Sequence, residues 1–525
     1  MIALVSKAKF PFASQTESIA ESTNDDRARQ STSLASWLQH VRAVAARLDA
    51  DDPLKEYRQQ FHFPTTAIVP EVRYFVGNSL GLQHKDVDSY VNAELHKWRT
   101  QGREGHFLPP HPWFEIDDFL REEMASLVGA KAASEVVLMN ALTVNLHLLL
   151  AAFYRPIGRR RKILCERFPF PSDMHAFISQ LELHGLSASD LIEVDGVRDL
   201  QNDDDDNNGS RADEPTPLCI PTEKFLSALE TYGDDIAVVV IGAVHFLTGQ
   251  FFDLPAITAA AHKKGVLVGV DAAHAVGNVL LRLHEWDVDF ACWGSYKYLN
   301  GGPGNVGMAF VHERHHLPLD DVQHNNAGDQ HLRSNATQKA TAMSPSPLGR
   351  GLKGWWGHSR AGRLSLHKTY DAAPGASALQ LSSPCVMSLM MLAPSLQLMA
   401  RIGMTALRAK GDRLTAFLER LLDAAPDPVS AAFTIVTPRN IRQRGSHLCL
   451  KINSGCRLGP RSTNNGCGES DAKFLESELK QRGVLVDCRP PDMIRLAPVP
   501  LYNSFADVAE FIAVLCDIQA VQILP

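Results

Sequence analysis

The sequence lacks the features that mark membrane, nucleic-acid-binding or disulfide-rich chains. No uncharged apolar run in its 525 residues approaches the roughly 20 residues of a membrane helix. The one basic block is a short RRRK at residues 159–162, and the net charge is -7, so nucleic acid is not an expected partner. The nine cysteines form no C-x-x-C pair, which argues against a zinc ribbon or a disulfide scaffold. We therefore expect a soluble, cytoplasmic protein with reduced thiols and no membrane contact.

Some segments have too little apolar periodicity to contribute to a core. Residues 1–50 have only a broken apolar stretch, with acidic residues from Glu17 on, which favours a partly disordered N-terminal tail over a targeting peptide. An aspartate run at residues 203–206 lacks the ligand spacing of a calcium loop, so no metal site is expected. Three polar segments are expected to be surface insertions: residues 202–217, 324–351 and 453–470.

The remaining sequence alternates strand and helix patterns. Residues 253–265 have an aspartate at the start, a proline shortly inside and a closing glycine, which are helix boundary signals. Short apolar runs typical of buried strands lie at residues 236–244, 266–271 and 288–294. This alternation predicts an α/β fold with a mainly parallel sheet between helices, in a large domain at residues 51–350. Residues 351–525 are expected to form an interface segment, which includes a methionine-rich helix, and a small α+β domain.

Two charged residues follow strand patterns of this sheet. Asp271 ends one strand and Lys297 follows another, with a helical segment expected at residues 274–278 between them. Open α/β sheets bind ligands at the carboxyl ends of their strands. A lysine amine and a carboxylate are what pyridoxal phosphate requires, one for its aldehyde and one for its pyridine nitrogen. These two residues alone leave a structural alternative open, in which Asp271 caps the next helix and Lys297 only pairs with it.

A glycine run beside the lysine fits the pattern G-x-G-x-x-G, from Gly302 to Gly307. A dinucleotide site would need a strand before the run and a helix after it. Here an expected strand follows, so a dinucleotide site is not expected. Residues 139–150 look like a loop that enters an apolar helix. The free N–H groups at the start of this helix are suited to bind a phosphate, with help from the Thr143 hydroxyl. The alternative is that Thr143 or Asn140 is an ordinary N-cap of the helix.

Several sequence blocks together carry a resemblance to a known family. They run in order over roughly residues 56–505 and include YFVGNSLGLQ, MNALTVNLHLLL, FPSDMHAF, VHFLTGQ, VDAAHAVGN, DFACWGSYKYLNGGPG, GWWGH and IRLAPVPLYNSF. The chain resembles the kynureninases, which are pyridoxal 5'-phosphate-dependent hydrolases. The resemblance implies the fold type I architecture of pyridoxal-phosphate enzymes, with a seven-stranded, mainly parallel central sheet and a smaller α+β C-terminal domain.

The resemblance also implies roles for individual residues. Lys297 would carry the Schiff base, Asp271 would pair with the pyridine nitrogen, and Phe170 would stack on the ring. Arg495 would hold the substrate α-carboxylate, and Trp355 would reach in from the partner subunit of a homodimer. Further residues would surround the ring and phosphate: Leu142, Thr143, Pro171, Ser172, Asp173, Gly242, His274, Tyr296 and Ser383. Others would lie near the substrate: Asn78, Ser79, His106, Ser382 and Ser383.

The implied activity is hydrolytic cleavage of the Cβ–Cγ bond of L-kynurenine or its 3-hydroxy form, in tryptophan catabolism and NAD biosynthesis. Tyr296 is a candidate for activating the water. The family commonly has a serine where this chain has Gly242, which leaves one phosphate contact open. Animal relatives have a Ser-Asn pair in place of Ser382-Ser383, which leaves open the preference between L-kynurenine and its 3-hydroxy form. Two alternatives remain open. The first is another lyase of this fold, such as a cysteine desulfurase, which would need a reactive loop cysteine such as Cys456 or Cys467. The second is an inactive dimeric scaffold.

Overall fold

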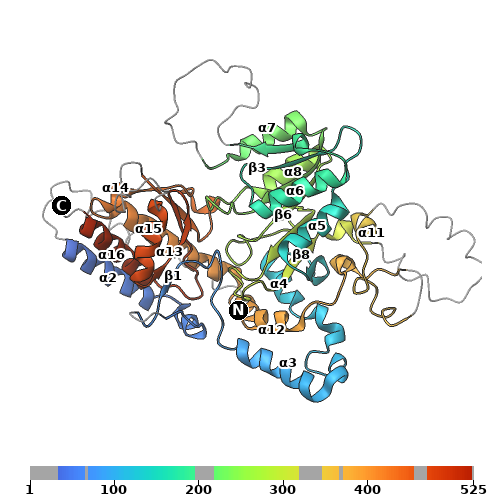
Figure 1. Ribbon diagram of the computed structural model, residues 1–525, viewed down its shortest axis with the longest axis horizontal. Coiled ribbons are helices and arrows are strands. Elements are labelled where there is room, and N and C mark those ends of the chain that lie inside the picture. The colour runs from blue at the N-terminus through green and yellow to red at the C-terminus, as the bar shows by residue number, and fades with distance from the viewer. Residues whose placement is uncertain are drawn as a thin grey trace, which may run out of the picture.

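The computed structural model describes residues 34–65, 69–195, 218–317, 346–365, 370–453 and 470–522. It contains a large α/β domain built on a seven-stranded sheet and a smaller lobe built on a four-stranded sheet (Figure 1). The expected insertion at residues 202–217 lies outside the described residues, as do residues 324–345 of the one expected at 324–351 and nearly all of that at 453–470. Residues Pro347–Arg350, however, form a short helix in which Pro347 and Leu348 are buried, so this end of the second segment is not a surface insertion.

The large sheet has the strand order β2-β8-β7-β6-β5-β3-β4. Strands β3, β4, β5, β6 and β7 run parallel to one another, and β8 is antiparallel to both β7 and β2. This confirms the predicted fold class, a seven-stranded and mainly parallel sheet. The strands are β2 (Val136–Leu138), β3 (Lys162–Glu166), β4 (Leu191–Val194), β5 (Ile236–Gly242), β6 (Leu267–Asp271), β7 (Phe290–Gly294) and β8 (Gly307–Val311).

The sheet is buried on both faces, because alternate residues of each strand belong to different cores. In β5, Val238 and Val240 pack with helices α5 and α6, whereas Val239 and Ile241 pack with helices α8 and α12. Continuous apolar strands therefore occur where the sequence predicted them. The helices of this domain are α3 (Val87–Gln101), α4 (Arg121–Val128), α5 (Leu142–Phe153), α6 (Pro171–Leu183), α7 (Thr222–Tyr232), α8 (Leu254–Lys263), α11 (Pro347–Arg350) and α12 (Val386–Ile402).

The smaller lobe packs helices on an antiparallel sheet of order β12-β13-β10-β9. Its strands are β9 (Phe433–Ile435), β10 (Leu448–Ile452), β12 (Asp487–Arg489) and β13 (Met493–Leu496), and a parallel pair joins β1 (Arg73–Tyr74) to β11 (Val484–Leu485). Its helices are α2 (Leu34–Ala50), α13 (Met404–Ala424), α14 (Val429–Ala432), α15 (Asp471–Gln481) and α16 (Phe505–Gln522).

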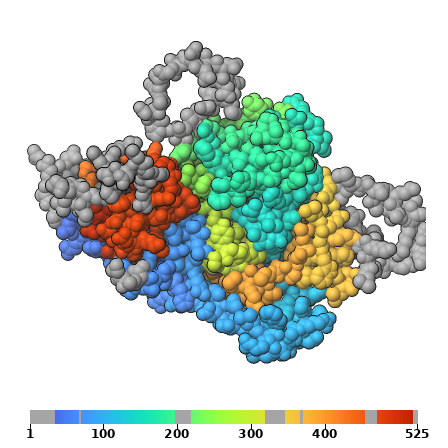
Figure 2. All heavy atoms as spheres, viewed as in Figure 1, coloured from blue at the N-terminus to red at the C-terminus, as the bar shows by residue number. Residues whose placement is uncertain are grey.

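Helix α2 corrects the expectation of a tail over residues 1–50. Val41, Val44, Ala45 and Leu48 are buried in the core of the smaller lobe. Their spacing gives the helix one apolar face, which packs against α16, so the two ends of the described chain lie side by side (Figures 1 and 2). Residues 34–50 therefore belong with the C-terminal lobe.

Other local expectations also differ from the structure. Residues 274–278 form turns instead of a helix, with Gly277 at a φ of 79°. The residue before α5 is Ala141, and no side chain caps that helix, so neither Asn140 nor Thr143 acts as its N-cap. Among the described helices, none is both long and apolar enough to cross a membrane on its own, and α12 and α13 meet that requirement only as a pair bent by 89°.

Candidate active site

A cavity with about 480 Å³ of empty space lies at the carboxyl ends of the central strands. Strands β3, β5 and β6 end there in Glu166, Gly242 and Asp271, and α5 and α6 begin beside them. This is the position at which open α/β sheets bind ligands. Ten residues that the sequence predicted to bind the cofactor line the cavity: Leu142, Thr143, Phe170, Ser172, Asp173, Gly242, Asp271, His274, Tyr296 and Lys297.

Lys297 is buried in this cavity, with 8% of its surface exposed. Its Nζ lies 2.7 Å from Nε2 of His274. Burial lowers the pKa of Lys297 to about 8, although Asp271 opposes that change. Burial and the nearby Lys297 charge hold the pKa of His274 well below its ordinary value. The histidine is therefore neutral and accepts a hydrogen bond from an amine that loses its proton more readily than an ordinary lysine does.

Two aspartates face each other beside the lysine. Oδ1 of Asp271 accepts a hydrogen bond from the amide of Ala273 at 2.7 Å. Burial, followed by the charge and hydrogen bonding of Asp271, raises the pKa of Asp173 well above its ordinary value. Burial and the neighbouring Asp271 carboxyl group thus both favour the protonated form of Asp173.

Aromatic rings border the amine. The Phe170 centroid lies 5.8 Å from Nζ of Lys297 and the Tyr296 centroid lies 5.7 Å from it. Phe246 packs its ring edge against Phe170, with the centroids 5.3 Å apart. Burial and the charges of Asp271 and Asp173 raise the pKa of Tyr296. Its phenol therefore keeps its proton at neutral pH and is a hydrogen-bond donor.

Unpartnered polar atoms in the cavity indicate a polar ligand. Oε2 of Glu166, Oδ1 of Asp173 and Nδ1 of His274 are buried and have no hydrogen-bond partner among the described residues. The first turn of α5, with Leu142 and Thr143, has no side-chain cap and offers free N–H groups to an anion. An amine, a carboxylate, an aromatic face and an anion-binding helix end together fit pyridoxal phosphate.

The other predicted site residues do not line this cavity. Four of them are exposed: Ser79, His106, Ser382 and Ser383. Asn78 is fully buried, and neither of its amide atoms has a partner in the described part of the chain. Pro171 opens helix α6 outside the lining, and Trp355 is 55% exposed with its Nε1 donating to the carbonyl of Arg363. Their assigned roles stay predictions.

Arg495 lies just behind the cavity wall. It is 1% exposed, donates from Nη1 to the carbonyl of Phe246, and forms an ion pair with Asp487 through Nη2. Burial lowers the pKa of its guanidinium to about 10. The group stays charged at neutral pH, and its partners fix its orientation.

Sequence reasoning missed four residues that line the cavity: Glu166, Val244, Phe246 and Ala273. Glu166 had a readable signal, because the strand KILCE ends in an acid as LVGVD does. The positions of Phe246 and Asp487 had no comparable signal in the sequence, since they depend on how the two lobes meet.

Comparisons with known proteins agree with this geometry. The family descriptions "Kynureninase C-terminal domain" and "Aminotransferase class-V" match residues 467–515 and 222–344. The chain is 42% identical to the kynureninase of Myxococcus xanthus, over 90% of this chain and 96% of that protein. It is 39% identical to the kynureninase of Mus musculus, over 90% of this chain and 92% of that one.

Solved structures with the same fold are more distant in sequence. A cysteine desulfurase from Thermococcus onnurineus aligns with a TM-score of 0.61 at 16% identity, covering 91% of this chain and 98% of that one. A mutant of C-DES with glycine covalently linked to its PLP cofactor aligns with a TM-score of 0.62 at 15% identity, covering 88% and 99%. These likenesses show the fold.

Proposed function

The chain belongs to the kynureninase family, and we propose that it hydrolyses the Cβ–Cγ bond of L-kynurenine to give anthranilate and L-alanine. The 3-hydroxy form would give 3-hydroxyanthranilate and L-alanine in the same way. The observation that carries the proposal is the buried Lys297 amine in a cavity that also holds Asp271 and Phe170.

The cofactor of this chemistry is pyridoxal phosphate. Lys297 would hold it covalently, Asp271 would keep its ring nitrogen protonated, and Phe170 would cover one face of the ring. The first turn of α5, with Leu142 and Thr143, would bind the phosphate. When bound, this cofactor supplies an electron sink for negative charge that develops on carbon atoms of the substrate.

The chain's own groups would then bind substrate and move protons. Lys297, with its pKa lowered to about 8, is suited to take a proton from the substrate Cα and return it. Arg495 stays charged at neutral pH, which supports its role in binding the α-carboxylate. The phenol of Tyr296 keeps its proton, so we assign it as a donor to oxygen atoms of substrate or cofactor.

The deciding experiment replaces the proposed anchor. Lys297→Ala should abolish both the absorbance of bound cofactor and turnover of L-kynurenine, a loss of at least about 10³-fold. Lys264→Ala is the matched control, because Lys264 pairs with Glu230 outside the cavity. Borohydride treatment of the wild type should leave the cofactor on the peptide that contains Lys297. Normal turnover by Lys297→Ala would refute the proposal.

No cysteine among the described residues lines the cavity, which does not favour a cysteine desulfurase. Cys385 is exposed at the start of α12, and although partial burial raises its thiol pKa, hydrogen bonds with Ser388 lower that pKa overall. This residue, however, lies outside the cavity lining. Burial raises the pKa of Cys165 and Cys292 well above the ordinary value, so neither is a reactive thiolate. Cys456 and Cys467 lie outside the described residues. Release of sulfide from L-cysteine, with no reaction on L-kynurenine, would favour that alternative.

We also propose a cytoplasmic homodimer. Large apolar side chains are exposed in the segment that contains Leu352, Trp355 and Leu364, at 56%, 55% and 66%, which is typical of a surface that a second subunit covers. The seven described cysteines are free thiols, as expected in a reducing compartment. Light scattering at micromolar concentration should give twice the chain mass of 57.7 kDa, and a monomer would contradict the assignment of Trp355 to the partner's site.

A further inference from the structure

Glu166 lies in the cofactor cavity although the sequence-based assignment gave it no role. It is the last residue of β3, Gly242 is the last residue of β5, and Asp271 is the last residue of β6. These strands are neighbours in the sheet, and Gly242 is the register partner of Asp271. The Glu166 carboxyl group therefore lies on the same edge of the sheet as Asp271, with β5 between their two strands.

The contacts of Glu166 place its carboxyl group over Gly242. Oε1 accepts a hydrogen bond from the Gly242 amide at 3.0 Å. A Cβ atom added to Gly242 would lie 2.9 Å from that same oxygen. The carboxyl group thus uses space that a side chain at position 242 would otherwise share.

The second oxygen of Glu166 lacks any donor. Glu166 is 3% exposed, and its Oε2 has no hydrogen-bond partner among the described residues. A charged carboxylate with one bare oxygen is costly in such a site, whereas a protonated carboxyl group becomes a donor aimed into the cavity. The geometry therefore favours the neutral form.

The charges around Glu166 point the same way. Acidic side chains face it from three other elements: Asp271 on β6, Glu193 on β4 and Asp173 on α6. Burial, with the charges of Asp271 and Glu193, raises the pKa of Glu166 to about 7, although the Gly242 hydrogen bond lowers it. Three carboxyl groups thus share a cavity with one lysine amine, and they cannot all be charged.

We propose that Glu166 is a positioning residue of the cofactor site: its neutral carboxyl group rests on Gly242 and leaves Asp271 as the charged carboxylate available to the cofactor's ring nitrogen. The inference rests on the proposed function, because it assumes pyridoxal phosphate as the ligand. Loss of the Glu166 proton would place a second negative charge beside Asp271. Since pyridoxal phosphate is itself anionic through its phosphate group, its binding should then weaken.

The test compares Glu166→Gln with Glu166→Ala in the full-length chain. Glutamine has the shape of a protonated glutamate and cannot ionise, whereas alanine leaves a hole and an unpaired Gly242 amide. Glu230→Gln is the matched control, because it makes the same chemical change at an exposed side chain that pairs with Lys264 outside the cavity. The dissociation constant of pyridoxal phosphate is measured by absorbance titration from about pH 6 to about pH 9, and circular dichroism checks folding.

We expect Glu166→Gln to bind pyridoxal phosphate within about twofold of wild type at about pH 6, and Glu166→Ala to bind about tenfold more weakly. The ratio of the wild-type to the Glu166→Gln dissociation constant should rise as the pH passes about 7. This ratio cancels the ionisation of Lys297, which both proteins share. Glu230→Gln should follow the wild type.

Two results would overturn the inference while leaving the proposed function intact. One is equal binding by Glu166→Ala and wild type, which would mean that the residue positions nothing. The other is a pH-independent ratio, or binding by Glu166→Gln as weak as that of Glu166→Ala, which would mean that the neutral form is not the working one. Failure of the wild type itself to bind pyridoxal phosphate would overturn both.

Discussion

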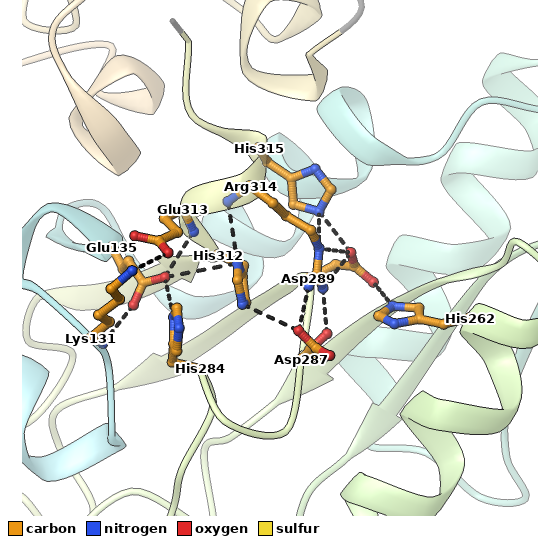
Figure 3. Close-up of polar contacts among 10 residues, drawn as sticks. All are labelled: Lys131, Glu135, His262, His284, Asp287, Asp289, His312, Glu313, Arg314 and His315. Carbon is orange, nitrogen blue, oxygen red and sulfur yellow. Dashed lines mark hydrogen bonds and ion pairs between the residues drawn. The ribbon is translucent and has the colours of Figure 1, made fainter. Parts of the chain in front are cut away.

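Strand β7 separates two buried polar clusters of opposite character. Beyond its carboxyl end lies Lys297 with the cavity carboxyl groups, where Oε2 of Glu166 and Oδ1 of Asp173 have no hydrogen-bond partner in the part of the chain that the structure describes. At its amino end lies Asp289, which belongs to a histidine–carboxylate cluster drawn in Figure 3. This cluster comprises Lys131, Glu135, His262, His284, Asp287, Asp289, His312, Glu313, Arg314 and His315.

Asp289 shows what complete pairing does to a buried carboxylate. One oxygen accepts from His262 at 2.8 Å and from the Val268 amide at 2.7 Å, and the other accepts from Arg314 at 2.9 Å and His315 at 2.7 Å. Burial raises its pKa, but these donors outweigh burial and hold the pKa below its ordinary value. Asp173, equally buried with few donors, has its pKa raised. Donors therefore decide whether a buried acid is charged.

The same cluster contains a group that resembles a metal site by spacing alone. Ligand atoms of Glu135, His284 and His312 lie within 4.8 Å of one another. The two imidazole rings, however, are stacked 4.4 Å apart with only 18° between their planes, so their nitrogens do not converge on one ion. Oε1 of Glu135 already accepts from His284 and from the amide of Glu313, both at 2.8 Å. We therefore assign these residues to packing.

The largest expected contrast compares Asp289→Asn with Asp173→Asn. Asparagine at position 289 presents N–H groups to donors that need an acceptor, so the free energy of unfolding should fall by about 3 kcal/mol. Asparagine at position 173 resembles the protonated acid and should change it by less than about 1 kcal/mol. Urea unfolding of both variants without added cofactor measures the difference. Equal losses would break the comparison.

The pH dependence of stability should slope in opposite directions for the two residues. The folded-state pKa of Asp289 is lowered, so its stabilisation is present above the unfolded pKa of about 3.9 and is lost as the pH falls. The folded-state pKa of Asp173 is raised, so its contribution falls as the pH rises above about 4. Relative to each Asn variant, the stability of the wild type should therefore change with pH in opposite directions at the two positions. Thermal midpoints from about pH 3 to about pH 7 test this, and parallel curves would contradict it.

Lys297→Met should stabilise the cofactor-free chain while abolishing cofactor attachment. The folded-state pKa of about 8 lies below the ordinary 10.5, so burial of the charged amine lowers stability at neutral pH, and this penalty disappears as the pH rises between those values. Loss of the His274 hydrogen bond offsets part of the gain, which leaves about 1 kcal/mol. Urea unfolding near neutral pH measures it. Destabilisation by Lys297→Met would mean that the amine contributes to the fold as Asp289 does.

The smallest effect is expected at an exposed position outside both clusters. Ser383→Asn should shift the ratio of kcat/KM for L-kynurenine and 3-hydroxy-L-kynurenine by a few-fold, about 1 kcal/mol, because an amide adds a hydrogen-bonding group near the proposed substrate ring. Steady-state assays with both substrates measure the ratio. An unchanged ratio removes Ser383 from the specificity argument.

Local sequence patterns predicted the site residues correctly where the pattern lies within a single strand. The apolar runs before Asp271 and Lys297 placed both residues at strand ends, and the structure brings them into one cavity. The segment between them was expected to be helical, but it forms turns. These turns place His274 within hydrogen-bond distance of the Lys297 amine, and Gly277 adopts a positive φ that a regular helix does not contain. Helix α2 was missed because its apolar face is satisfied only by α16, which lies far along the chain.

The residue types that end the central strands could be identified without the fold, because the periodicity and the apolar content of a strand are local properties of the sequence. The sequence also determined the family, through the order of its blocks. The order of the strands came from the tertiary fold: β5 pairs with β3 on one side and with β6 on the other, which brings Glu166 next to Gly242 and onto the same sheet edge as Asp271. The protonation states of Glu166, Asp173 and Asp289 were likewise undecided until folding, because burial and the donors that face each carboxyl group come from distant segments.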